Sequence, residues 1–364
     1  MAKTGDRSNY YALLMAGGVG SRFWPVSREA FPKQFHDMLG TGDTLLQRTF
    51  KRLSRLVPED QILILTNSKY DALVKEQLPG IPSKNIVLES AMRNTAPCIL
   101  LSALKVYKEN PDATMIVAPS DSWIEDEDAF IENLQEAFNA SAKADTIVTL
   151  GIQPTFPNTG YGYINYEKSD SNVAKSVIAF TEKPDYETAK VFYESGSYLW
   201  NAGMFIWSAA TILNAFKKHL PVMYTLFEKG MAVYNTAAEQ DFIDTHYGQS
   251  ENISIDYGVM EKHKEVKVVP ATFDWNDLGT WGSLYDKLDK DTTQNAVVNA
   301  RTIVQESSGN IISTTAGKVV VVDGIKDYII VETQDVLVIV PKSKEQDIKQ
   351  LRNAVQSKFD SKLG

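Results

Sequence analysis

Glycines and cations are combined in one segment near the N-terminus, AGGVGSRFWPVSREAFPKQF. Gly17, Gly18 and Gly20 let backbone N–H groups approach a ligand closely, because glycine has no side chain to hold the ligand off. Arg22 and Lys33 follow on a path that two prolines stiffen. Two cations on a rigid loop beside exposed amides fit a triphosphate. The alternative is a basic surface loop that binds no ligand.

Two familiar phosphate-binding motifs are excluded for this loop. The dinucleotide fingerprint GxGxxG requires a third glycine where this chain has Phe23. The P-loop signature GxxxxGK[ST] is absent from the sequence. The loop runs for 27 residues, from Gly17 to Asp43, before the next clear helical pattern. Ordinary loops between a strand and a helix have about 2–6 residues, so this length indicates a functional loop.

The elements that must position this loop follow an α/β pattern. Short continuous apolar runs alternate with helical patterns, and the runs cover residues 11–16, 61–66, 85–88, 114–118 and 146–151. Continuous runs are typical of strands buried on both faces of a parallel sheet, and their alternation with helices predicts a layered α/β domain. Ligands in such sheets bind beyond the carboxyl ends of the strands. Asp121 follows the run TMIVAPS and is expected at such an end.

The last quarter of the chain has a different pattern. Short β-branched runs bounded by turn residues begin near Asn310, Val319, Tyr328 and Val336. This spacing predicts a small all-β module, either a meander or a short β-solenoid, followed by a helix over residues 343–358. The intervening segment 152–288 carries aromatic-rich runs and is interpreted as insertions that build one wall of a pocket.

Composition limits the class of protein. The 364 residues are 43% hydrophobic and 23% charged, as in soluble globular proteins. The net charge of −9 argues against a generic nucleic-acid binder but does not exclude small phosphate ligands, which respond to local charge. Cys98 is the one cysteine, so it is expected in the core, and a reducing cytoplasm is favoured. No apolar run approaches the ~20 residues that span a bilayer, and the N-terminus lacks the apolar core of a secretory signal.

The loop GGVGSRFWPVSREAFPKQF resembles the activation loop of sugar-1-phosphate nucleotidyltransferases, in the version found in mannose-1-phosphate guanylyltransferases. The resemblance covers most of residues 10–340 and continues, in order, through ESAMRNTAP at 89–97, PSD at 119–121, FTEKP at 180–184, WNAGMF at 200–205 and WNDLGTW at 275–281. Long members of this family add a sugar-isomerase cupin domain at the C-terminus. This chain resembles the monofunctional form without it.

The resemblance implies a Rossmann-like nucleotidyltransferase domain over residues 1–288. A small β-rich domain, similar to a left-handed β-helix with a terminal helix, is expected over residues 289–364. The implied reaction converts GTP and α-D-mannose 1-phosphate into GDP-mannose and pyrophosphate with Mg2+. Because a sugar phosphate oxygen attacks the α-phosphorus in line, catalysis consists of charge neutralisation and alignment. A different base or sugar preference stays open, as does a non-catalytic sugar-nucleotide sensor, which would be expected to lose Arg22, Lys33 or a metal aspartate.

The resemblance also implies a set of catalytic and nucleotide-binding residues. Arg22 and Lys33 are expected on the departing β,γ-phosphates and on the α-phosphate, while Asp121 and Asp277 hold Mg2+. Asp277 could instead be a helix N-cap or turn aspartate. The implied nucleotide contacts are Ala16, Gly17, Gly18, Gly20, Ser21, Glu89, Asn94 and Ser120. The family usually has alanine and histidine where this chain has Ser120 and Ser122.

Base selection is assigned to Glu89 and Asn94. Guanine presents N1–H and an exocyclic amine as adjacent donors, and one carboxylate accepts from both, which adenine cannot satisfy. Glu89 could instead cap the helix that begins near Thr95. The role of Arg28 is likewise open between a phosphate contact and a brace for the loop. His36 receives no functional assignment.

The implied sugar-phosphate contacts are Gly162, Glu182, Lys183 and Asn201. Glu182 would accept hydrogen bonds from sugar hydroxyls, and Lys183 would bind the sugar phosphate. Tyr161 and Trp200 either wall the sugar pocket or pack in the core, and Asp256 is expected to support the pocket from behind. The expected partners are two small-molecule substrates, with no nucleic acid and no membrane; a homodimer is left open.

Overall fold

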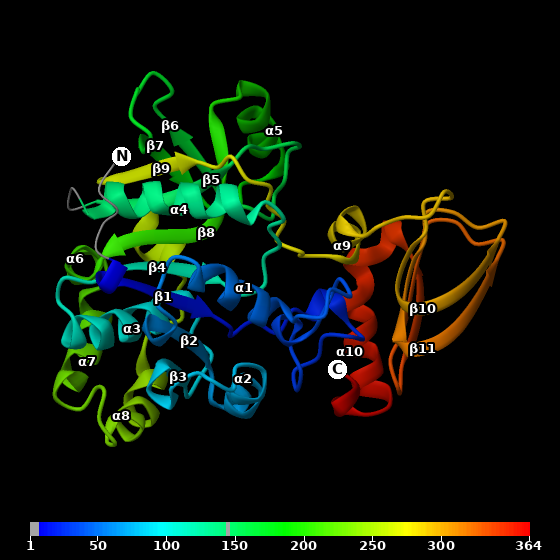
Figure 1. Cartoon of the computed structure of the whole chain (residues 1–364), viewed down its shortest axis with the longest axis horizontal. Coiled ribbons are helices and arrows are strands. Elements are labelled where there is room, and N and C mark those ends of the chain that lie inside the picture. The colour runs from blue at the N-terminus through cyan, green and yellow to red at the C-terminus, as the bar shows by residue number, and fades with distance from the viewer. Residues whose placement is uncertain (1–6, 143–145) are drawn as a thin grey trace. The chain divides into compact units, whose positions relative to one another are not determined.

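The computed structural model describes residues 7–142 and 146–364, with backbone only for residues 315 and 316 (Figure 1). The chain divides into two compact units, neither of which is continuous in sequence. Unit 1 consists of residues Met1–Gly17, Phe50–Ser120 and Ile124–Trp275, and unit 2 of residues Gly18–Thr49, Asp121–Trp123 and Asn276–Gly364. The proposed division at residue 288 follows the order of the chain and stays a prediction.

Unit 1 contains, among its described residues, a nine-stranded sheet in the order β3-β2-β1-β4-β8-β5-β9-β7-β6. The strands are β1 (Tyr10–Met15), β2 (Ile62–Asn67), β3 (Ile86–Glu89), β4 (Thr114–Pro119), β5 (Ile147–Ile152), β6 (Tyr163–Tyr166), β7 (Lys175–Thr181), β8 (Tyr198–Ser208) and β9 (Val266–Pro270). Strands β1 to β4 are parallel to one another, whereas β8 runs antiparallel to both β4 and β5. The five strands expected from continuous apolar runs all form, each within one residue of its expected start.

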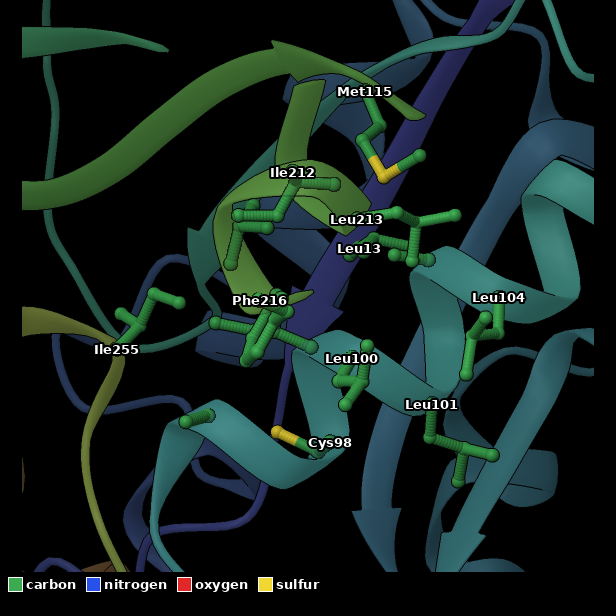
Figure 2. Packing of buried hydrophobic residues seen from close by; sticks show 14 of the residues in the cluster. Leu13, Cys98, Leu100, Leu101, Leu104, Met115, Ile212, Leu213, Phe216 and Ile255 are labelled. Carbon is green, nitrogen blue, oxygen red and sulfur yellow. The ribbon is translucent and has the colours of Figure 1, made fainter. Parts of the chain in front are cut away.

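Helices lie around this sheet (Figure 1). They are α2 (Asp71–Gln77), α3 (Thr95–Glu109), α4 (Glu127–Ala142), α5 (Tyr186–Ser195), α6 (Ala209–His219), α7 (Pro221–Glu228) and α8 (Glu239–His246), while α1 (Leu45–Ser54) crosses the boundary between the units. Figure 2 shows Leu100 and Leu104 of α3 in one buried cluster with Phe216 of α6 and Leu13 of β1. Cys98 lies in the same cluster and is 4% exposed, which confirms it as a core residue.

Unit 2 contains a four-stranded sheet among its described residues, in the order β10-β11-β12-β13. Its elements are β10 (Ala296–Gln305), β11 (Ile311–Asp323), β12 (Tyr328–Glu332), β13 (Leu337–Pro341), α9 (Trp281–Lys287) and α10 (Ile348–Lys358). The runs near Asn310 and Val319, expected as separate strands, form the single strand β11. Its chain turns at Gly317, where φ is +86°, and the pairing with β10 shifts register there: Ser313 pairs with Val298, and Lys318 resumes the pairing opposite Ala300. The predicted terminal helix begins later, at Ile348, because residues 342–347 form a 3-10 helix.

From Gly18 onward the glycine-rich loop belongs to unit 2 and shares its core. Phe23 and Trp24 lie in one buried cluster with Ile311 of β11 and Val331 of β12. Both aromatic side chains are at most 2% exposed. The loop therefore packs on the C-terminal strands, and its rigidity comes from this hydrophobic core as well as from its own turns. None of the described helices is both long and apolar enough to cross a membrane.

Candidate functional site

The glycine-rich loop is built around a close contact between Gly20 and Lys33. Gly20 has φ +65°, a left-handed conformation that other residues rarely adopt. A Cβ atom at this position would lie 2.6 Å from the Cβ of Lys33 and 3.2 Å from Ser27 Oγ. Ser27 Oγ in turn donates to the carbonyl of Val19 at 2.5 Å. Glycine is therefore required at position 20, because the stem of Lys33 occupies the space that a side chain would need.

Lys33 joins three segments of unit 2. Its Nζ lies 2.9 Å from Asp121 Oδ2 and donates to the carbonyls of Asp277 and Leu278, both at 2.9 Å. The residue is 3% exposed, so these three acceptors replace the water that a surface lysine would have. The sequence placed Lys33, Asp121 and Asp277 in one catalytic group, and the structure brings Lys33 against both aspartate segments.

Arg22 differs from Lys33 in having an open guanidinium. The side chain is exposed in the 3-10 turn Ser21–Phe23, and no described residue pairs with it. The neighbouring glycines Gly17 and Gly18 would tolerate a Cβ without a clash. Arg22 and Gly18 are exposed, whereas Lys33 is buried and held in place by protein acceptors.

Arg28 braces the loop. Its Nη1 donates to Asp335 Oδ2 at 2.7 Å, Nη2 contacts Asp335 Oδ1 and donates to Thr333 Oγ1 at 3.0 Å, and Nε donates to Pro25 O at 3.0 Å. The hydrogen bonds from Arg28 lower the pKa of Asp335 to about 2. Each nitrogen of the guanidinium therefore has a protein partner. Of the two roles left open for Arg28, a phosphate contact and a brace for the loop, the structure favours the brace.

The two expected metal ligands have different surroundings. The Asp121 carboxylate is 41% exposed and shares one oxygen with Lys33. Asp277 Oδ1 accepts from the N–H of Gly279 at 3.0 Å, so this residue forms the turn that the sequence offered as its alternative. It is not the cap of α9, because Thr280 fills that position. In the described part of the chain no group of three or more His, Cys, Asp and Glu side chains forms a ready metal cage.

Glu89 lies at the end of β3 and is buried in unit 1. Its Oε2 accepts from the hydroxyl of Tyr247 at 2.7 Å, and its Oε1 lies 3.6 Å from the position of a Cβ built on Gly17. Burial raises the pKa of Glu89 to about 7, against the opposing effect of the Tyr247 hydrogen bond. Asn94 caps α3 with its own side chain, so the alternative of Glu89 as that cap is wrong.

The remaining nucleotide residues lie at the ends of β1 and β4. Ala16 donates to the carbonyl of Leu65 at 2.8 Å and accepts from Thr66 Oγ1 at 2.9 Å. Ser120 donates its N–H to Met15 O at 3.0 Å and is 1% exposed. The Ala16 bonds tie the end of β1 to β2, and the Ser120 bond ties it to the end of β4, at the edge of the sheet where ligands of α/β folds bind.

A second group of charged residues in unit 1 surrounds Glu182. Its Oε1 contacts the ammonium of Lys183, while Oε2 is buried without a hydrogen-bond partner among the described residues. Burial lowers the pKa of Lys183, but the contact with Glu182 and the nearby Asp256 and Tyr257 together outweigh it, so the net shift is upward. Lys183 has φ +46°, a strained conformation that typically marks functional positions. An unsatisfied buried carboxylate oxygen is costly, which indicates that a donor is missing at this place.

Gly162 and Asn201 complete this group. A Cβ on Gly162 would lie 2.4 Å from Glu182 Oε2 and 3.3 Å from the Asn201 Cβ, so only glycine leaves room for the Glu182 carboxylate at this place. Asn201 Nδ2 donates to Asp256 Oδ1 at 2.9 Å. Burial, and then the charge of Glu182, raise the pKa of Asp256 to about 6. The four residues expected to bind the sugar phosphate are therefore brought together, with Asp256 behind them.

Aromatic side chains flank this region. The rings of Tyr161 and Trp200 lie 5.0 Å apart, and Tyr161 is 5.2 Å from Trp275. Trp200 is 4% exposed, so most of its ring packs in the interior. Sequence reasoning missed Tyr247 altogether, since nothing in DTHYGQS marks this tyrosine as the partner of a residue 158 positions away.

Comparison with known proteins agrees with this geometry. The family model described as nucleotidyl transferase matches residues 11–294, and the model described as a MannoseP isomerase/GMP-like beta-helix domain matches residues 300–353. The chain belongs to the nucleotidyl transferase family. The expected fold class, an α/β nucleotidyltransferase domain with a small C-terminal β-rich domain, is confirmed.

Within this family the similar proteins carry one recurrent name. The chain is 36% identical over 360 residues to the mannose-1-phosphate guanylyltransferase of Escherichia coli, covering 96% of this chain and 74% of the relative. It is 37% identical over 345 residues to the alginate biosynthesis protein AlgA of Pseudomonas aeruginosa, covering 93% and 70%. A crystal structure from Thermus thermophilus, described as a mannose-1-phosphate geranyltransferase, matches with a TM-score of 0.86 and 32% identity over 96% of this chain and 99% of that one. The resemblance to mannose-1-phosphate guanylyltransferases is thereby confirmed.

Proposed function

We propose that this protein transfers a guanylyl group from GTP to α-D-mannose 1-phosphate and releases pyrophosphate. The observation that carries the proposal is the position of Lys33, held between Asp121 and the carbonyls of Asp277 and Leu278 on a glycine-rich loop. The three N–H donors of this ammonium are used by one carboxylate and two backbone carbonyls, so the expected contact of Lys33 with the α-phosphate is wrong; Lys33 instead fixes Asp121 where that carboxylate can hold a metal ion on the phosphate. The names of the similar proteins support the choice of guanine and mannose.

The chemistry is a substitution at phosphorus. An oxygen of the sugar phosphate forms a bond to the α-phosphorus, the bond from that phosphorus to the bridging oxygen of the β-phosphate breaks, and pyrophosphate leaves. The nucleophile is already ionised at neutral pH, so no general base is required. Since both reactants are anions, the protein accelerates the reaction by holding them in line and compensating the charge.

Asp121 and Asp277 are the proposed holders of Mg2+. Their carboxylates are hard oxygen donors, and two carboxylates with substrate phosphates form the usual protein site for this ion. The 41% exposure of Asp121 leaves room for a further ligand on that carboxylate. When bound, the ion would polarise the phosphate oxygens and offset developing charge. Lys33 orients Asp121 for this task, and Arg22 compensates the charge of the departing pyrophosphate.

The nucleotide is proposed to contact the backbone at Ala16, Gly17, Gly18, Gly20 and Ser21, with Ser120 at the neighbouring strand end. Glu89 and Asn94 are proposed at the base. On the sugar side, Glu182 Oε2 is a buried acceptor without a donor, which a sugar hydroxyl would supply. Lys183 is proposed to bind the sugar phosphate, while Asn201 and Gly162 shape the pocket.

A single buried cysteine fits a reducing cytoplasm, which we propose as the compartment.

The test is a pyrophosphate-release assay in which one component at a time is omitted. Release is expected only when GTP, mannose 1-phosphate and Mg2+ are all present. Release that continues without the sugar phosphate would indicate hydrolysis of GTP. Tight binding of GDP-mannose without any turnover would favour the alternative of a sugar-nucleotide sensor.

A further inference from the structure

Glu89 and Tyr247 form an isolated buried pair in unit 1. Tyr247 begins a 3-10 turn, Tyr247–Gln249, directly after α8, and its side chain is fully buried. Its hydroxyl donates to Glu89 Oε2 at 2.7 Å. Among the described residues no other group donates a hydrogen bond to this carboxylate. Tyr247 is therefore the hydrogen-bond partner that fixes the orientation of the Glu89 side chain.

The two oxygens of Glu89 face different surroundings. Oε2 is occupied by Tyr247, whereas Oε1 lies on the side of Gly17, 3.6 Å from the position of a Cβ there. Gly17 is one of the residues proposed to contact the nucleotide. The oxygen without a hydrogen-bond partner among the described residues is therefore the one that lies beside a segment proposed to contact the nucleotide.

Two other titratable groups near this pair, Arg93 and Cys98, form hydrogen bonds to backbone carbonyls and not to Glu89. Arg93 donates from Nε to the carbonyl of Gly248 at 3.1 Å, so its guanidinium holds the turn and does not bond to Glu89. Cys98 Sγ donates to Thr95 O at 3.2 Å, and burial raises the pKa of this thiol well above its ordinary value. Neither group donates a hydrogen bond to the Glu89 carboxylate, so the Tyr247 hydroxyl is the donor that stabilises its charge.

We propose that Tyr247 is a positioning residue for base selection: by binding Glu89 Oε2 it presents Oε1 to the N–H groups of guanine. The inference rests on the proposed function and adds to it the group that makes Glu89 selective. Guanine donates from N1 and its amine to a carboxylate, whereas adenine offers an unprotonated N1 that the carboxylate repels. Without the hydroxyl, the buried carboxylate would lose its compensating donor and take up a proton at a higher pH, because burial already raises its pKa to about 7.

The variant Tyr247→Phe removes only the hydroxyl. Hydrogen bonds to charged groups are the stronger class, so we expect kcat/KM for GTP to fall roughly tenfold to a hundredfold. The ratio of GTP to ATP turnover should fall with it, the KM for mannose 1-phosphate should stay unchanged, and the acid limb of the GTP pH profile should move to higher pH. Tyr247→His, whose ring N–H can donate, should recover part of the selectivity.

The matched control is Tyr234→Phe. Tyr234 is also fully buried, and its hydroxyl donates to a backbone carbonyl, Phe227 O, at 2.5 Å. This variant should lose stability without losing base preference. An unchanged GTP-to-ATP ratio and pH profile in a folded Tyr247→Phe protein would overturn the proposal. If Tyr247→Phe does not fold, Tyr247→Met takes its place, because it also removes the hydroxyl; a wild-type GTP-to-ATP ratio in that folded variant would overturn the proposal as well.

Equilibrium binding of GTP and ATP separates this inference from the proposed function. If the wild-type protein releases no pyrophosphate, the proposed function fails, but the binding preference can still be measured. A wild-type preference for GTP that is lost in Tyr247→Phe would support the role of Tyr247 in base selection. Equal binding of GTP and ATP by the wild type would contradict it.

Discussion

The contact between Gly20 and Lys33 gives the sharpest prediction for the loop. In Gly20→Ala the new methyl group would start 2.6 Å from the Lys33 Cβ, and ordinary contact begins at 3.4 Å, so one of the two must move by about 0.8 Å. The left-handed backbone adds a cost of roughly 1–2 kcal/mol for a residue with a Cβ. Overpacking adds roughly 1–3 kcal/mol. Together these effects should lower the free energy of unfolding and displace the Lys33 ammonium from Asp121.

A displacement of this size is large for a catalytic group. Misplacing a reacting or positioning group by about 1 Å can cost roughly a hundredfold in rate. We therefore expect kcat of Gly20→Ala to fall between roughly tenfold and a hundredfold, measured by pyrophosphate release at saturating substrates. A melting curve recorded on the same sample separates loss of fold from loss of rate.

Gly40→Ala is the matched control for backbone strain. Gly40 has φ +73°, close to that of Gly20, but a Cβ at this position would lie 4.0 Å from its nearest neighbour, Val298 Cγ1. This variant should lose stability and keep its turnover. If Gly40→Ala loses as much turnover as Gly20→Ala, backbone strain alone explains the effect. Wild-type kcat and GTP KM in Gly20→Ala would refute the role given to the contact with Lys33.

Three further outcomes follow from the same geometry. Asp121→Asn and Asp277→Asn should each lower turnover by roughly a hundredfold or more, because each removes a charge that stabilises the transition state; near-wild-type rates at saturating Mg2+ would remove that residue from the metal site. Lys183→Ala should raise the KM for mannose 1-phosphate and leave that for GTP unchanged, and the reverse pattern would mean that the two phosphate sites are interchanged. Glu89→Gln should gain stability relative to the wild type as the pH rises from about 5 to about 8, by roughly 2 to 3 kcal/mol. The sign follows because the pKa of Glu89 in the folded state, about 7, lies above its ordinary value of 4.5. The wild-type fold is therefore stabilised by the protonated carboxyl at low pH and loses this stabilisation as the pH rises through 7. Chemical denaturation of both proteins at both pH values measures the effect; a difference in stability between Glu89→Gln and the wild type that does not change with pH would contradict it.

The elements of the sheet could be predicted because their signals are local. The apolar runs that become β1 and β4 are continuous, and Asp121 follows one of them directly, so its place at a strand end could be read from the sequence. The glycine-rich loop was likewise evident from its composition. The composition does not show that this loop packs in one core with β11 and β12, because the sequence around Phe23 and Trp24 does not indicate which residues they contact.

The partners of the charged side chains were harder to predict. Lys33 donates to the carbonyl of Asp277, 244 positions away, and a backbone carbonyl has no residue-type signature. Arg28 pairs with Asp335 across 307 positions, in a segment that reads as an ordinary turn between two strands. The Tyr247 hydroxyl reaches Glu89 only because α8 ends beside β3. Residue types therefore indicated the candidate groups for the chemistry, which stay predictions, while the groups that orient them could be found only from the fold.

The central claim is most directly tested by the identity of the product. Four nucleoside triphosphates are incubated with each of several hexose 1-phosphates and Mg2+, and pyrophosphate release is measured while the sugar nucleotide is identified by mass spectrometry. The account predicts fastest release with GTP and mannose 1-phosphate and a product with the mass of GDP-mannose. Equal release with ATP, or faster release with another sugar phosphate, would contradict it.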